Sequence, residues 1–345
     1  MRVLIVGCGY VGLPLGAELA GQGHEVFGLR RARAAEAELK AAGVRLLTAD
    51  ITAMADLQKL PGPFDWVVNT VAPHKGGVEE YRHVYLHGMR NLVAWLGPMP
   101  PEKFVYTSST SVYGQTDGSW VDERSPTEPA SDTSRILLET EEVLRAAARS
   151  ADFSPIPSPL PKVAEKRTKV RAPLLTPRRS PPRCDEATAR RVGSGTEVGA
   201  PLLKNLPAVI LRVAGIYGPG RGYWFQQYLR GEATMPEGGK RILNMIHRDD
   251  LAGIIIAALK QGQPGEIYNA VDDEPVAQID FFRWLSQTLR REMPPFAAAT
   301  QEPARKRGFT EKRVSNEKLR TQLGYAFKYP TFRQGFAAAA LPHPK

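Results

Sequence analysis

The sequence predicts an α/β protein built on a doubly wound parallel sheet. Along residues 1–150, short apolar runs alternate with amphipathic stretches long enough to form helices. The first apolar run passes directly into a glycine-rich turn, and polar residues follow two of the later runs. Strands separated by helices in this way pair in parallel and are covered on both faces. The composition, with 42% hydrophobic and 24% charged residues among 345, suits a globular chain.

The first unit is a strand, a glycine turn and a helix. The apolar run Arg2–Val6 indicates a buried strand, and it leads into Gly7-Cys8-Gly9-Tyr10-Val11-Gly12. The first two glycines of this G-x-G-x-x-G motif would let the backbone turn tightly and approach a pyrophosphate, and the third would let the helix pack on the sheet. We expect the helix at about Tyr10–Ala20, with the amides at its start facing the phosphates. The unit predicts a dinucleotide-binding site.

The second strand, His24–Leu29, bears on the form of the nucleotide. NAD-binding units usually end this strand with an acidic residue that binds the ribose 2′-hydroxyl, whereas here Arg30, Arg31 and Arg33 follow Leu29. No carboxylate repels a 2′-phosphate, and guanidinium groups suit phosphate oxygens. We therefore expect NADP(H) to be favoured over NAD(H). The alternative is that these arginines only cover a solvated loop.

The alternation continues to residue 150, with ligand-binding positions at the strand ends. Asp50 and Ile51 follow the third strand, and Thr70 and Ala72 lie at the carboxyl end of the fourth, at the edge where ligands bind in such sheets. Asp50 is expected either to reach the adenine amino group or to cap a helix. The sequence predicts strands at Arg45–Ala49, Trp66–Val71 and Phe104–Ser108, and helices at Arg33–Ala42, Met54–Leu60, Val78–Leu96 and Ser131–Arg149.

Residues 151–206 form a Pro- and Arg-rich insert between two regular regions. The segment holds nine prolines, has no apolar period, and contributes +6 of the net charge of +10. Such a composition predicts disorder. The insert is either a genuine linker or a stretch read out of frame from GC-rich DNA. The remaining excess of +4 is dispersed, so we expect no nucleic-acid partner.

Regular structure resumes at residue 207. We expect Asp249 or Asp250 to cap the helix Leu251–Gln261. The other predicted elements are strands at Ala208–Arg212, Arg241–Ile246 and Glu266–Ala270, and helices at Phe225–Arg230, Ile279–Arg290 and Asn316–Leu323. No apolar run reaches the length of a membrane span, and the first strand begins at residue 2, so we expect neither a membrane segment nor a signal peptide and place the protein in the cytoplasm.

Several motifs agree in order with one family. Lys103–Gly114 (KFVYTSSTSVYG) resembles the fifth-strand motif of extended short-chain dehydrogenases/reductases, the NAD(P)-dependent epimerase/dehydratase family. Leu211–Arg221, Ile246–Ala252, Gly265–Pro275 and Lys312–Asn316 resemble later segments of that family. The resemblance implies an NAD(P)-binding Rossmann core at 1–150, and the last strand or strands with a small α/β substrate-binding subdomain at 207–335.

The family's catalytic groups are only partly present. Its members use a Tyr with a Lys four residues later as acid/base pair, a Ser that orients the substrate oxygen, and an Asn on the helix after the fourth strand. The Ser matches Ser109, and the Asn position falls on Tyr85. The Tyr and Lys positions fall near Thr133 and Leu137, and none of the eleven tyrosines has a lysine four residues on. The resemblance therefore implies an atypical subgroup.

Replacement chemistry has few candidates. Tyr113 and Tyr85 are candidate acids, although packing roles are the alternative for both. Arg221 and Arg241 match positions where relatives contact substrate phosphates, which suggests an anionic ligand, with surface arginines as the alternative. His83 and His87 share a helix face, but no third ligand is visible and we expect no metal.

Two functions fit this pattern. The first is an NADP(H)-dependent oxidoreductase, epimerase or dehydratase acting on a small, sugar-derived or anionic substrate through a non-standard site. The second is a cofactor-binding protein without turnover, such as a redox-sensing regulator. A small-molecule substrate is the expected partner, with a homodimer as one option for assembly.

Overall fold

The computed structural model describes residues 1–73, 76–149, 206–297 and 310–340. Contacts between Cα atoms divide the chain into two units, Met1–Asp152 with Leu202–Lys345, and Phe153–Pro201. The second unit and most of the 151–206 insert lie outside the described residues. Both interpretations of the insert therefore stay predictions.

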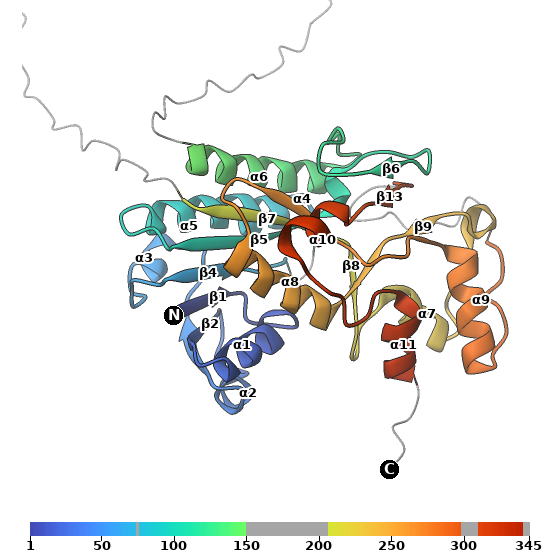
Figure 1. Cartoon of the computed structure of the whole chain (residues 1–345), viewed down its shortest axis with the longest axis horizontal. Helices are drawn as coiled ribbons and strands as arrows, with labels where there is room; N and C mark the ends of the chain where they lie inside the picture. Colours follow the sequence, from blue (N-terminus) through green and yellow to red (C-terminus); the bar gives the residue numbers. More distant parts are fainter. Residues whose placement is uncertain (74–75, 150–205, 298–309, 341–345) are drawn as a thin grey trace, which may run out of the picture. The chain divides into compact units, whose positions relative to one another are not determined.

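A seven-stranded parallel sheet forms the centre of this unit (Figure 1). Its strand order, β11-β7-β5-β4-β1-β2-β3, starts from β1 and winds outward in both directions, as predicted for a doubly wound sheet. The strands are β1 (Arg2–Val6), β2 (Glu25–Arg30), β3 (Val44–Thr48), β4 (Trp66–Asn69), β5 (Lys103–Ser109), β7 (Ala208–Val213) and β11 (Ile267–Ala270).

Helices cover both faces because successive strand residues point to opposite sides. Leu4 and Val6 of β1 pack with α4, α5 and α6, whereas Val3 and Ile5 pack with α1, α8 and α10. The first layer contains α4 (Val78–Tyr81), α5 (Gly88–Leu96) and α6 (Asp132–Arg149), and the second contains α1 (Gly12–Gly21), α8 (Arg248–Gln261) and α10 (Glu317–Leu323). The short helices α2 (Glu36–Ala41) and α3 (Met54–Leu57) follow β2 and β3.

The expected long helix at 78–96 has a π-helical segment in its middle. Residues Arg82–His87 adopt this wider turn between α4 and α5. Tyr85 lies in it and is buried. Such π-segments are often found at functional sites, because they shift the register of the side chains that follow.

A smaller lobe is assembled from the part of the chain after β7. Its core is rich in aromatic residues, among them Tyr217, Phe225, Phe281, Phe282 and Phe336. The lobe contains β8 (Gly215–Tyr217), β9 (Ile242–Leu243), β10 (Met245–His247), β12 (Val276–Ala277), α7 (Tyr223–Leu229), α9 (Gln278–Leu289) and α11 (Phe332–Ala340). Strand β13 (Arg313–Val314) pairs with β6 (Trp120–Val121).

Two local predictions in this region are wrong. The expected single strand 241–246 is broken at Asn244, whose amide side chain leaves the strand to bind Lys312 O (2.9 Å) and the Val314 amide (2.8 Å). Helix α8 is capped by His247 rather than by an aspartate, since His247 Nδ1 accepts the Asp249 amide at 3.2 Å. Among the described residues, no helix has the length and apolar character to cross a membrane.

Candidate functional site

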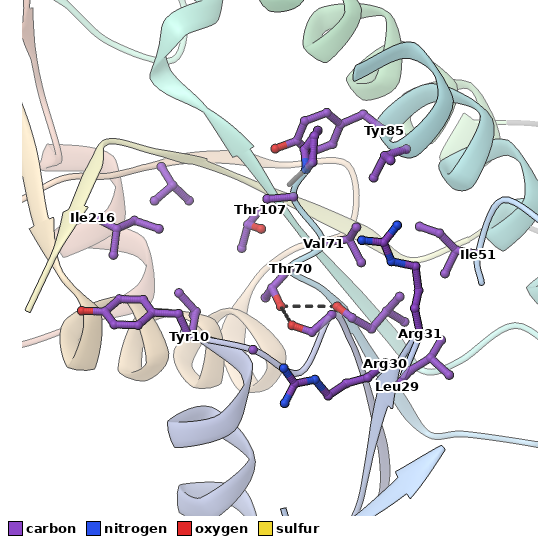
Figure 2. Close-up of a pocket in the computed structure, with 18 of the residues that line it drawn as sticks. Tyr10, Leu29, Arg30, Arg31, Ile51, Thr70, Val71, Tyr85, Thr107 and Ile216 are labelled. Atoms are coloured by element: carbon purple, nitrogen blue, oxygen red, sulfur yellow. Dashed lines mark hydrogen bonds between the residues drawn. The ribbon is translucent and has the colours of Figure 1, made fainter. Parts of the chain in front are cut away.

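A cavity of about 890 Å³ opens at the carboxyl ends of β1, β2, β4 and β5. Figure 2 shows this cofactor cavity, into which side chains from these strand ends project. The predicted cofactor residues that line it are Gly7, Gly9, Tyr10, Val11, Arg30, Arg31, Asp50, Ile51, Thr70 and Ala72. The remaining one, Gly12, lies behind the wall, where a Cβ atom would come within 2.9 Å of Ile5 Cγ2. Gly12 thus serves the packing of α1 on β1.

The glycine loop is shaped by close backbone approach. Gly7 has φ +84°, and a Cβ there would lie 2.8 Å from the Val71 nitrogen, so glycine is required. Thr70 Oγ1 donates to Gly7 O at 2.9 Å and ties the loop to the end of β4 (Figure 2). A Cβ at Gly9 would meet only Gly7 O, at 3.8 Å, and would project into open space. The loop therefore leaves room for a phosphate against Gly9 and the start of α1.

Two arginines extend from the end of β2 into the cofactor cavity. In Figure 2 the Arg31 side chain points toward the side of Ile51 and Val71, and the Arg30 side chain points the other way. Within the described part of the chain, neither arginine forms an ion pair with a carboxylate. Both guanidinium groups are thus available to a phosphorylated ligand.

Asp50 does not cap α3, whose N-cap residue is Ala53. Asp50 Oδ1 instead accepts the amide and the hydroxyl of Thr52, at 2.9 and 2.7 Å. The capping alternative is therefore wrong for α3. Asp50 lines the cofactor cavity, and its contact with an adenine stays a prediction.

A second cavity, of about 280 Å³, adjoins the first. The two share Val213, Ala214, Gly215, Ile216 and Tyr223 in their walls. We call it the substrate cavity, because it is the space next to the cofactor cavity where a second molecule would lie. Its polar lining includes Ser109, Ser111, Arg241, Asn244, Thr310 and Lys312, and its aromatic lining Tyr217, Tyr223, Trp224, Phe225, Phe281 and Phe336.

Of the four positions that hold the family's catalytic groups, one keeps the family's residue, Ser109, and three hold other residues. Ser109 lines the substrate cavity, is 4% exposed, and its Oγ accepts the Ser111 amide at 3.2 Å. Tyr85 lines the cofactor cavity from the π-helical segment (Figure 2). Thr133 and Leu137 are buried in α6, so a short hydroxyl and an apolar side chain stand where an acid/base pair is expected.

Tyr113 has to be withdrawn as a candidate acid. It is fully buried and lines neither cavity. Its hydroxyl donates to Asn269 Oδ1 and accepts from Arg212 Nη1, both at 2.9 Å. Burial raises the pKa of this phenol to about 12, although Arg212 opposes the shift. Tyr113 is a structural residue.

The two arginines predicted to bind substrate line different cavities. Arg221 lines the cofactor cavity rather than the substrate cavity, with its guanidinium carbon 4.9 Å from the centre of the Tyr10 ring. The assignment of Arg221 to the substrate stays a prediction. Arg241 lines the substrate cavity, and its guanidinium carbon lies 5.6 Å from the centre of a Trp224 ring.

Lys312 is the residue that sequence reasoning missed. It is 4% exposed and lines the substrate cavity, and its Nζ donates to Tyr113 O and Thr310 Oγ1, both at 2.8 Å. Burial, assisted by the charge of Arg241, lowers the pKa of Lys312 to about 8. The segment Lys312–Asn316 had been matched to the family, but nothing in its spacing placed the lysine beside Ser109.

The sheet order, the glycine loop and the cavity at the strand ends define a Rossmann-type NAD(P)-binding fold. The model of the NAD dependent epimerase/dehydratase family matches residues 3–164. Protein YeeZ of Escherichia coli K12 is 26% identical over 95% of this chain and 96% of its own length, and a 3-diazoavenalumate denitrifying reductase of Streptomyces sp is 27% identical over 97% and 99%. DesIV, a dTDP-glucose 4,6-dehydratase of Streptomyces venezuelae solved with NAD bound, superposes with a TM-score of 0.72 at 20% identity, covering 98% of this chain and 95% of DesIV.

The motif order and the match of the family model over residues 3–164 make this chain similar to the NAD dependent epimerase/dehydratase family. None of its eleven tyrosines is followed by a lysine four residues later, so it differs from the usual pattern of that family.

Proposed function

We propose that this protein is an NADP(H)-dependent reductase that transfers hydride to a small molecule in the substrate cavity. The observation that carries the proposal is the shared wall Val213–Ile216, which brings a dinucleotide-sized cavity and a small second cavity together at the carboxyl edge of the sheet. Ser109 lies on the substrate side of that wall. A ligand bound there would lie next to the nicotinamide end of a bound nucleotide.

The lining of the cofactor cavity supports NADP(H) over NAD(H). Strand β2 ends at Arg30, and Arg31 follows it into the cavity, so the ribose end meets two guanidinium groups and no carboxylate of β2. A 2′-phosphate would gain charge-assisted hydrogen bonds there. The bound nicotinamide would supply the hydride, while the glycine loop would hold the pyrophosphate.

The direction of the reaction follows from the missing acid/base pair. Oxidising a substrate hydroxyl needs a base that removes its proton, and Thr133 and Leu137 cannot provide one. Reduction of a simple carbonyl would need the same group as an acid, whereas hydride added to an electron-poor aromatic or conjugated carbon gives a delocalised anion that takes its proton from water and leaves NADP⁺. The Streptomyces relative, which is named as a reductase, supports this direction.

The test is hydride transfer by the purified full chain. NADPH deuterated at C4 is incubated with a panel of small electron-poor aromatic and conjugated compounds, and deuterium in the product is measured by mass spectrometry. We expect transfer from one face of the nicotinamide, and a loss of at least tenfold in kcat/KM for Ser109→Ala. Tight NADPH binding with no transfer to any compound would contradict the proposal and support a redox-sensing regulator, which the buried Thr133 and Leu137 also favour.

A further inference from the structure

The substrate cavity contains two cationic side chains and an aromatic wall. Lys312 and Arg241 both line it, and the charge of Arg241 acts on Lys312. Six of the other lining residues are aromatic, among them Phe281 and Phe336, which are buried, and Trp224, which is half-buried. Cationic side chains beside a partly aromatic apolar lining are the two parts of a site for an amphipathic anion.

Lys312 is held firmly in this position. Its Nζ donates to Tyr113 O at the end of the turn that begins at Ser109, and to Thr310 Oγ1. Its carbonyl is bound by Asn244, the residue that interrupts the strands on either side of it. The ammonium is thus fixed from both ends of its residue, as expected of a preorganised binding group.

The Lys312 ammonium has fewer hydrogen-bond acceptors than hydrogens and no counter-ion among the described residues. Two acceptors take its hydrogens among the described residues, although an ammonium has three to donate. Within the same residues, no carboxylate forms an ion pair with Lys312. A buried cation without a counter-ion is costly, and a bound anion would relieve that cost.

The size and walls of the cavity select the rest of the ligand. About 280 Å³ is at the lower end for ligand pockets, which suits a molecule with one ring and excludes a second nucleotide. The Phe281 and Phe336 rings lie 5.6 Å apart at an interplanar angle of 65°, an edge-to-face arrangement that another aromatic ring can join.

We propose that Lys312, together with Arg241, binds the carboxylate of a single-ring aromatic acid, which makes small aromatic acids the substrate class of this protein. That these acids are substrates, and not only ligands, rests on the proposed reductase function. The anion site itself depends only on the cavity, so it is measured as binding, separately from turnover.

The experiment is calorimetric titration of the full chain with benzoate and trans-cinnamate, with and without NADP⁺. We expect both acids to bind, and benzamide, which has the same shape without the charge, to bind at least tenfold more weakly. Lys312→Met should weaken cinnamate binding about 10- to 100-fold. Lys260→Met is the matched control, since Lys260 is exposed and lines neither cavity, and its affinity should match that of the wild type.

The pH dependence gives a second measurement that a purely structural lysine would not move. The ammonium of Lys312, with a pKa of about 8, loses its proton between pH 7 and 9, so cinnamate affinity should fall about tenfold over that range. Arg241 stays charged there, while the Tyr113 phenol, with a pKa of about 12, and the Thr310 hydroxyl stay neutral. Lys312→Arg should retain binding and lose this pH dependence.

The outcomes separate the two proposals. Acid binding that depends on Lys312 without hydride transfer would support the site and contradict the reductase function. Equal binding of cinnamate and benzamide, or unchanged affinity in a folded Lys312→Met, would overturn the site. Tighter binding of phenyl phosphate than of benzoate would overturn the carboxylate assignment.

Discussion

Arg212 of β7 and Glu141 of α6 form a buried ion pair, with Arg212 Nη2 2.7 Å from Glu141 Oε2 and at most 3% of either side chain exposed. The pair is the centre of a wider network. Ser108 Oγ donates to Glu141 Oε1 at 2.6 Å, and Arg212 Nη1 donates to the Tyr113 hydroxyl. Since Ser108 lines the cofactor cavity and Tyr113 O holds Lys312, the network supports the walls of both cavities.

Removing one residue of the Arg212–Glu141 ion pair should lower the free energy of unfolding far more than removing both. Glu141→Gln leaves the Arg212 guanidinium buried without a counter-ion, and we expect the free energy of unfolding to fall by about 3–5 kcal/mol. The double variant Glu141→Leu with Arg212→Met should lose less, as measured by urea unfolding. Asp132→Asn, in the exposed pair with Arg135, is the control and should cost less than about 1 kcal/mol. A Glu141→Gln cost as small as that control would contradict this account.

Gly9→Ala should separate nucleotide binding from folding. A Cβ at Gly9 meets only Gly7 O at 3.8 Å, so the fold accepts it, but it projects into the space left for the pyrophosphate. We expect an unchanged melting temperature and at least a tenfold loss of NADPH affinity, measured by fluorescence titration. Gly21→Ala, at an exposed position outside both cavities where an added Cβ meets nothing within 4 Å, is the control for general effects of alanine. Wild-type affinity in Gly9→Ala would place the pyrophosphate elsewhere.

The arginines after β2 should determine the preference for NADPH. Replacing Arg30 and Arg31 together by serine removes both guanidinium groups from the cofactor cavity, and NADPH affinity should fall by about 10- to 100-fold. NADH, which has no 2′-phosphate, should bind with little change. Arg33→Ser removes the same charge from an exposed residue that does not line the cavity. Equal losses of affinity for NADPH and NADH would show that the arginines do not bind the 2′-phosphate.

Cys8 should be unreactive although it lies within the glycine loop. Burial raises the pKa of its thiol to about 12, outweighing the opposing effect of Arg30, so at pH 8 only about one thiol in ten thousand is ionised. In a Cys184→Ser variant, a disulfide reagent should label no thiol in the folded protein and one after denaturation. Labelling of the folded variant at the rate of a free thiol would contradict this prediction.

Lys312→Met should be stabilising even though it weakens ligand binding. The substitution removes a buried charge and keeps a side chain of similar length. The pKa of Lys312 is lower in the folded protein than in the unfolded chain, so the charged lysine opposes folding most below about pH 8. At pH 7 we expect the free energy of unfolding to rise by about 1–3 kcal/mol. The gain should shrink as pH rises above 8, where the folded lysine becomes neutral. A loss of stability at pH 7 would mean that the bonds to Tyr113 and Thr310 dominate.

The local features of the fold could be predicted because they depend on local patterns. Arg2–Val6 was predicted with its exact bounds, and the end of α10 before Gly324 follows from a glycine with φ +58°. Predicted ends elsewhere differ by a few residues. The π-helical segment 82–87, which packs against α6, has no sequence signal of its own.

The substrate cavity could not be predicted, because long-range contacts assemble it. Ser109 and Lys312 are about two hundred residues apart in the chain, and only the fold brings them to one cavity. Glu141 is buried with Arg212 of β7 as its ion-pair partner, and the helix pattern of residues 131–149 alone does not reveal that partner. The sequence makes Tyr113 a candidate acid because it does not show that this same network encloses the side chain.

Strand β7 lies between β5 and β11, yet it begins at Ala208, long after β5 ends at Ser109. During synthesis, the amino-terminal half therefore leaves the ribosome with β5 as an uncovered sheet edge, a template for wrong pairing until β7 arrives. The far wall of the cofactor cavity, which includes Val213 and Leu251, is translated later still. Although the glycine loop is among the first residues to emerge, firm capture of the nucleotide belongs to the completed polypeptide.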